Sequence, residues 1–163
     1  MKKSILFLLL SGLCMAAVAQ NTCYIKRADA FFTVNMPGMI MKDDAGNDVR
    51  PTPTIERIIY IECVGKKAPL IASVNYNNTM QLSALKKTVG KIIYIGKRAD
   101  NSNDIKIIAG KGNSIWKIEF NPSNEKTGIK AGCKNITIIS RAGTKQCTYN
   151  LNTETELAGL PRY

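Results

Sequence analysis

The segment 55–64, with the sequence IERIIYIECV, constrains the fold of this chain more than any other stretch. Four of its ten residues are isoleucine, and β-branched and aromatic side chains favour the pleated surface of a sheet. Because side chains alternate across a strand, the odd-numbered residues from Arg57 to Cys63 share one face and the even-numbered residues from Ile58 to Val64 share the other. We therefore expect a central strand with an apolar core face and a second, half-polar face toward solvent.

Similar short segments recur along the chain, separated by residues that are typical of turns. Segments 23–27 and 31–41 are predicted to be two separate strands, and Asn77-Asn78 predicts a tight hairpin turn, because asparagine tolerates a positive φ. A second hairpin is expected around residues 110–113, between segments 104–109 and 114–120.

Residues 83–87 fit either the end of a strand or one helical turn. Eight to ten short strands with regular turn signals predict an all-β fold. The expected architecture is an antiparallel β-sandwich of immunoglobulin-like size, with a barrel as the alternative.

Residues 1–19 have the three parts of a secretory signal peptide: a basic start, an apolar run and a small-residue cleavage site. The apolar run is shorter than the roughly 20 residues that span a membrane, and no later run reaches that length. A lipid anchor at Cys14 is disfavoured, since Leu13 stands where a lipoprotein usually has a small residue. We expect a bacterial-type leader that is cleaved after Ala19, which predicts a secreted or periplasmic protein.

The expected mature chain has one β domain at 20–151, followed by a polar tail at 152–163 that we expect to be peripheral. Without Lys2 and Lys3 of the leader, it has 21 basic and 12 acidic residues, and thus a net charge of +9. A positive field favours acidic partners, such as an acidic polysaccharide, a lipid surface or an acidic protein. Three adjacent basic pairs are the candidate binding residues: Lys66, Lys67, Lys86, Lys87, Lys97 and Arg98.

Four cysteines remain in the expected mature chain, and an even count in a secreted domain favours two disulfides. If the last hairpin turns at Ala142-Gly143, Ile138 lies opposite Cys147. Cys133 is then about 16 Å further along the partner strand, beyond the roughly 7 Å that a disulfide allows between Cα atoms. The preferred pairs are therefore Cys63–Cys147 and Cys23–Cys133.

The chain contains no histidine. This excludes Ser-His-Asp and Cys-His catalysis and the histidine-based zinc sites. No glycine-rich phosphate loop is present, so nucleotide binding has no support, and no cofactor or metal is expected. Three aspartates in the segment 42–48 suggest calcium, but Ala45 occupies a ligand position of the calcium-loop pattern, so a turn is favoured.

Two carboxylates can still hydrolyse a glycoside without histidine. Glu62 and Glu119 are the most notable of the available acidic residues, which include Asp29, because both lie among apolar residues in predicted strands. Outward-facing ion pairs with lysines are the simpler interpretation of both. Trp116, the single tryptophan, is interpreted as a core anchor, with a sugar-stacking platform as the alternative.

These features favour a binding or envelope-interaction protein with an anionic partner over an enzyme. Its binding surface is expected on a sheet face or on loop tips of a rigid sandwich. Two alternatives remain open: a carboxylate-based glycan hydrolase, and an accessory subunit that adds a strand to a partner's sheet edge.

Overall fold

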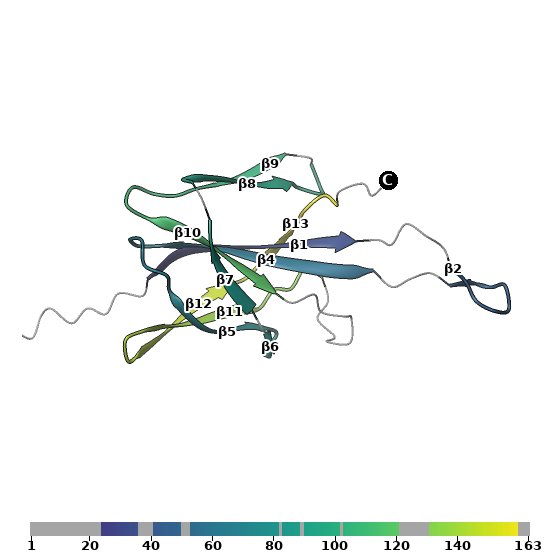
Figure 1. The fold of residues 1–163 in the computed structure, drawn as a ribbon, viewed down its shortest axis with the longest axis horizontal. Helices are drawn as coiled ribbons and strands as arrows, with labels where there is room; N and C mark the ends of the chain where they lie inside the picture. The colour runs from purple at the N-terminus through teal and green to yellow at the C-terminus, as the bar shows by residue number, and fades with distance from the viewer. Residues whose placement is uncertain are drawn as a thin grey trace, which may run out of the picture.

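The computed structural model describes residues 24–35, 41–49, 53–81, 83–88, 90–101, 103–120 and 131–159. These ranges contain thirteen strands and no helix, which confirms the predicted all-β fold. Two main sheets pack face to face as a β-sandwich, and a hairpin covers the outer face of the larger sheet (Figure 1). The sheets have free edges, so the barrel alternative is not adopted.

The predicted central strand is the middle strand of the larger sheet. β4 (Thr54–Cys63) lies between β1 (Ile25–Asn35) and β10 (Ser114–Phe120), and the edge strands are β13 (Glu154–Glu156) and β7 (Ser83–Lys87). All neighbours in this sheet pair antiparallel except β1 and β13, which are parallel. The segments predicted at 23–27 and 31–41 both contribute to the single strand β1.

The smaller sheet has the order β12–β11–β5–β6. Its strands are β5 (Leu70–Tyr76), β6 (Thr79–Gln81), β11 (Ile136–Ala142) and β12 (Lys145–Leu151). Asn77 and Asn78 join β5 to β6 with φ angles of 47° and 67°, which confirms the predicted turn. After β6 the chain crosses to the larger sheet as β7, so residues 83–87 are a strand and not a helical turn.

The main core lies between these two sheets. On β4, Ile59, Ile61 and Cys63 have no exposed surface, as the alternation of side chains predicts. They belong to one buried cluster with Val74, Tyr76 and Ile138 of the smaller sheet, and with Trp116. Trp116 is 9% exposed, and its Nε1 donates to Ser114 Oγ at 2.9 Å, which confirms its role as a core anchor.

A third layer covers the other face of the larger sheet. β8 (Ile92–Lys97) and β9 (Asp104–Ile108) form an antiparallel hairpin, and Ile107 packs in a second cluster with Phe31 and Tyr60. The expectation that the second face of β4 lies toward solvent is therefore wrong, because Tyr60 and Glu62 are buried beneath this layer. The hairpin expected between segments 104–109 and 114–120 is also wrong, since β9 pairs with β8, and β10 with β4 and β7.

The last hairpin has a different register from the predicted one. Its turn is at Gly143-Thr144, so Cys147 lies opposite Ser140, and Ile138 lies opposite Tyr149. Cys63 and Cys133 are free thiols. Both predicted disulfides, Cys63–Cys147 and Cys23–Cys133, are therefore wrong. Cys63 sits in the larger sheet beside Ile25 and Ser114, whereas Cys147 sits on an edge strand of the smaller sheet.

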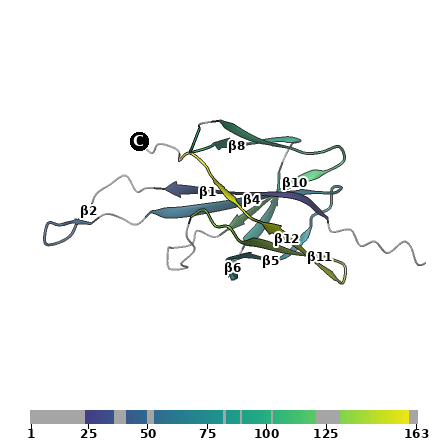
Figure 2. The same ribbon diagram turned by 180° about the vertical axis from the view of Figure 1, so that it is seen from behind.

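The polar C-terminal segment is part of the fold as far as the structure describes it. After β12 the chain runs to the side of β1 (Figure 2), where Glu154–Glu156 pairs with residues 30–32 as β13. Leu157 is buried and joins the second cluster. The expected peripheral tail is thus wrong for residues 154–157, because a parallel pairing with β1 fixes them.

The aspartate-rich segment forms a short hairpin between β2 (Met41–Lys42) and β3 (Asp48–Val49). Asp43 Oδ1 accepts hydrogen bonds from the backbone N–H groups of Ala45 and Asn47 at 3.0 and 2.8 Å, which confirms the predicted turn. No helix in the described part of the chain is long and apolar enough to cross a membrane. The predicted leader at 1–19 lies outside the described residues.

Candidate functional site

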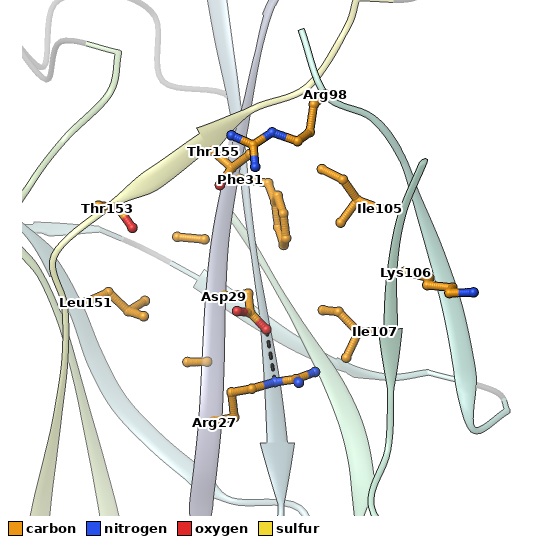
Figure 3. Close-up of a pocket in the computed structure, with 12 residues that line it drawn as sticks. Arg27, Asp29, Phe31, Arg98, Ile105, Lys106, Ile107, Leu151, Thr153 and Thr155 are labelled. Carbon is orange, nitrogen blue, oxygen red and sulfur yellow. Dashed lines mark ion pairs between the residues drawn. The ribbon is translucent and has the colours of Figure 1, made fainter. Parts of the chain in front are cut away.

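An open pocket of about 290 Å³ lies where the β8–β9 hairpin meets β1 and β13 (Figure 3). Its lining combines an apolar wall with charged and hydroxyl groups. The apolar side chains are Phe31, Ile105, Ile107 and Leu151, and the polar ones are Arg27, Asp29, Arg98, Lys106, Thr153 and Thr155.

Strand alternation on β1 supplies one side of the pocket. Arg27, Asp29 and Phe31 follow one another at every second position, so they share the face that lies beneath the hairpin. The pairing of β1 with β4 shifts register between Ile25 and Arg27, and such a bulge redirects the side chain that follows it. Figure 3 shows Arg27 and Asp29 projecting into the pocket next to Phe31.

Arg27 connects two carboxylates. Its Nε lies 3.1 Å from Asp29 Oδ2 and 3.9 Å from Glu62 Oε2. The side chains of Arg27 and Asp29 are 45% and 40% exposed, so both are accessible from the pocket. A guanidinium carries five N–H donors in a planar fork, and these two contacts engage only Nε. These contacts leave the Nη groups able to donate hydrogen bonds to a further anion.

Asp29 has an altered proton affinity. Partial burial raises the pKa of its carboxyl above the ordinary range, and the negative charge of Glu62 adds to this, while the Arg27 guanidinium opposes it. Protonation of Asp29 would leave the positive charge of Arg27 less compensated. The charge of the pocket therefore depends on the protonation of Asp29, whose pKa lies above the ordinary value of an aspartate.

Arg98 enters the same pocket from a distant part of the chain. It follows β8, bridges to Leu157, and lies over Thr155 in Figure 3. Asp100 fixes its orientation, since Arg98 Nε and Nη2 contact the two Asp100 carboxylate oxygens at 3.0 Å each. Lys106 differs, because its side chain points away from the pocket and contributes only to the rim (Figure 3).

A second open hollow, of about 860 Å³, adjoins the first. The two share Arg98, Thr153 and Thr155 in their linings. Because they share these residues, the two hollows lie next to each other along the β13 segment, and we refer to them together as the groove. A groove of this kind can accommodate an extended ligand as well as a single small group.

The six basic residues predicted from the sequence do not gather at one site. Lys86 and Lys87 lie on β7, and the bend that carries Lys66 and Lys67 is held beside β10 by Ser114 Oγ, which donates to Gly65 O at 2.7 Å. Arg98 lines the groove, and Lys97 precedes it at the end of β8.

Lys86 and Lys87 lie on β7, one edge strand of the larger sheet, whereas Arg98 lies next to β13, the other edge strand. Lys66 and Lys67 follow β4, the middle strand, so they belong to neither edge. Four strand spacings of about 4.8 Å separate these edges, roughly 19 Å. Of the predicted residues, only Arg98 therefore belongs to the lining of the groove.

Of the other groove residues, the sequence analysis names only Asp29, as one of several available carboxylates. Arg27 and Asp29 alternate with Phe31, a signal for one polar-and-aromatic strand face, but the prediction of two separate strands at 23–27 and 31–41 hides this alternation. Thr153 and Thr155 lie in the segment predicted to be a peripheral tail, and the sequence there has no strand periodicity that would point to them.

Asp29 and Glu62 lie near each other and are the candidate pair for the predicted carboxylate-based hydrolysis. Because both contact Arg27 Nε, their oxygens are no more than about 7 Å apart, a limit that includes the spacing of about 5–5.5 Å in retaining glycosidases. Burial alone raises the pKa of Glu62, but hydrogen bonds from Asn113 and the Gly110 N–H outweigh it and hold the pKa below its ordinary value. A raised and a lowered pKa in one pair suit an acid and a base.

Glu62, however, has a clear structural role. Its side chain is 7% exposed. Its Oε1 accepts hydrogen bonds from the Gly110 N–H at 2.9 Å and from Asn113 Nδ2, so it holds the loop between β9 and β10. Glu119 pairs instead with Lys86 and Lys117 on the surface, as the simpler interpretation predicts.

Within the described ranges, no three Cys, Asp or Glu side chains are grouped so that they could hold a metal ion. No family model, curated protein or solved structure matches this chain.

Proposed function

We propose that this protein is a secreted or periplasmic binding domain that holds an acidic polysaccharide in the groove along β13. One observation carries the proposal: Arg27 and Arg98, more than seventy residues apart in sequence, line the same open pocket. The signal-peptide pattern and the basic composition support an extracytoplasmic, anionic partner.

The other groove residues favour a saccharide. Guanidinium groups bind carboxylates and sulfates through paired N–H donors. Thr153 and Thr155 provide hydroxyl groups that can both donate to and accept from sugar hydroxyls. The half-buried side chains of Ile105 and Leu151 add apolar surface for the less polar face of a sugar ring.

The test is a titration of the mature protein with oligogalacturonate, followed by amide NMR. We expect shifts at Thr153, Thr155 and Ile105, and weaker binding at higher salt. Arg27→Gln and Arg98→Gln should each lower the affinity about tenfold to a hundredfold, because a hydrogen bond to a charged group contributes about 1.5–3 kcal/mol.

Arg141→Gln is the matched control. Arg141 is an exposed arginine of β11, outside the groove, so the variant loses the same charge without touching the site. An equal loss of affinity in all three variants would mean that only the net charge matters, and would contradict a specific groove. An absence of binding to oligogalacturonate and to other acidic glycans would contradict the proposal itself.

A carboxylate-based glycan hydrolase is the second candidate, favoured by the proximity of Asp29 and Glu62. Release of reducing ends from envelope or acidic glycans, abolished by Asp29→Asn, would support it. In that case the wild-type protein would shorten the oligogalacturonate during the titration, whereas a binding domain leaves its length unchanged.

The accessory-subunit hypothesis has one supporting observation. β12 spans seven residues and pairs only with β11 among the described strands, which leaves one edge for a partner strand. Cross-linking to a partner through a cysteine introduced at Thr148, rather than through one at Arg27, would favour this hypothesis over the groove.

A further inference from the structure

The β8–β9 hairpin is apolar on both of its faces. Its inner face, with Ile93, Ile105 and Ile107, packs against the second cluster of the larger sheet. On the outer face, Ile92 lies directly opposite Ile108, and Tyr94 is the next outward residue on β8. These three side chains are 51%, 52% and 73% exposed, so the described residues leave them open to solvent.

Basic residues surround this outer face. Lys106 lies opposite Tyr94 in the hairpin register, and Lys91, Lys97 and Lys111 are exposed at the two ends. The segment 90–113 has five basic and two acidic residues, and one of the acidic ones, Asp100, is paired with Arg98. The apolar strip therefore lies within a positively charged rim.

We propose that Ile92, Tyr94 and Ile108, with the lysines around them, form a docking surface for an anionic lipid bilayer. Aliphatic side chains enter the acyl boundary at shallow depth, while a tyrosine places its ring there and its hydroxyl among the headgroups. The lysines extend their stems along the same surface and keep their ammonium groups at the anionic headgroups.

The composition of the face argues for a bilayer and against a protein partner. A stable protein interface buries about 800 Å² on each side and is depleted in lysine. Three apolar side chains ringed by lysines are too few for such an interface. Reversible bilayer binding needs only a shallow apolar contact combined with attraction to acidic lipids. The surface lies on the opposite side of the hairpin from the groove, so this proposal does not depend on the proposed function.

Co-sedimentation with vesicles tests the proposal. We expect the mature protein to bind phosphatidylcholine vesicles that contain phosphatidylglycerol, less so at high salt, and not to bind vesicles of phosphatidylcholine alone. Tyr94→Ser should lower the partition coefficient about tenfold, because a large aromatic side chain is no longer transferred from water into the bilayer. Leu70→Ser is the matched control, since Leu70 is 63% exposed on the smaller sheet.

A second measurement remains informative if the serine variant folds poorly. In Tyr94→Trp, tryptophan emission should shift to the blue on acidic vesicles and be quenched by brominated lipid, while in Leu70→Trp it should not. Equal binding of Tyr94→Ser and wild type, or no quenching of Tyr94→Trp on sedimenting vesicles, would overturn the proposal. Arg27→Gln should leave vesicle binding unchanged, so a failure of the groove and a failure of this surface are distinguishable.

Discussion

Arg57 Nε and Glu154 Oε1 lie 3.1 Å apart inside the sandwich, with side chains only 5% and 0% exposed. Arg57 comes from β4 and Glu154 from β13, and the Arg57 guanidinium carbon lies 5.1 Å from the centre of the Tyr76 ring. Glu154 Oε2 also accepts the backbone N–H of Cys133 at 3.2 Å. This ion pair therefore links both sheets and the C-terminal segment at one buried point.

Replacement of Glu154 by Gln should destabilise the protein strongly. Removal of one partner of a buried ion pair typically costs about 3–5 kcal/mol. The free energy of unfolding in urea measures this. Glu156→Gln is the control, because Glu156 lies in the same strand but is exposed. A loss below about 1 kcal/mol for Glu154→Gln, as for an exposed pair, would contradict the prediction.

The sequence predicts the position of Arg57 but not its partner in this ion pair. Alternation placed Arg57 on the core face of the central strand, which is correct, but a core arginine needs a buried partner. That partner is 97 residues away, in a polar segment without strand periodicity. A parallel pairing with β1 gives no local signal, because no turn joins the two strands.

The predicted hairpin around residues 110–113 is wrong for a similar physical reason. The segments 104–109 and 114–120 alternate well and are separated by a glycine-containing turn, but a turn signal does not say whether the flanking strands pair with each other. The apolar residues on both faces of β9 allow it to join a third layer. The two arginines of the groove converge only because of that layer, so the groove could not be predicted from spacing along the chain.

Asp29 should give the stability an unusual pH dependence. Because burial raises its pKa in the folded state, the folded protein holds more protons than the unfolded chain between the unfolded value, about 3.9, and the folded one. Its contribution to the free energy of unfolding is therefore present below that window and is lost as the pH rises through it.

Urea unfolding of wild type and Asp29→Asn across the acidic range measures this contribution. The free energy of unfolding of the variant minus that of wild type should increase as the pH rises through the window, because the asparagine of the variant does not titrate. Asp44→Asn, an exposed change in the turn between β2 and β3, controls for the loss of one carboxylate. A decrease with rising pH would show that Arg27, and not burial, dominates.

Cys63 and Cys133 should not react with alkylating reagents in the folded protein. Both are buried, and burial raises the pKa of the Cys63 thiol to about 12, with a contribution from the charge of Glu62. The thiolate is the reactive form, so its fraction at neutral pH is negligible at Cys63. Mass spectrometry after iodoacetamide treatment should find both residues unlabelled without urea and labelled with it.

Cys23 and Cys147 should form the disulfide of the mature protein. Cys63 and Cys133 are free, so these two cysteines are the ones left in the expected mature chain. Cys147 lies on β12, which contacts β1, and Cys23 precedes β1 by two residues. Non-reducing peptide mapping should recover one peptide pair that contains both residues. A pair that contains Cys63 or Cys133 in native protein would contradict the structure.

Glu62 and Glu119 should differ in their effect on stability, although the sequence gives them the same strand context. Glu62→Gln removes the charged acceptor that the partly buried Gly110 N–H and Asn113 share, and we expect a cost of about 1–3 kcal/mol. Glu119 is 30% exposed and pairs with two surface lysines, so Glu119→Gln should cost less than about 1 kcal/mol. Thermal or urea unfolding measures both. If Glu62→Gln left stability unchanged, the carboxylate would not hold the loop between β9 and β10, and its burial beside Asp29 would then favour the hydrolase alternative.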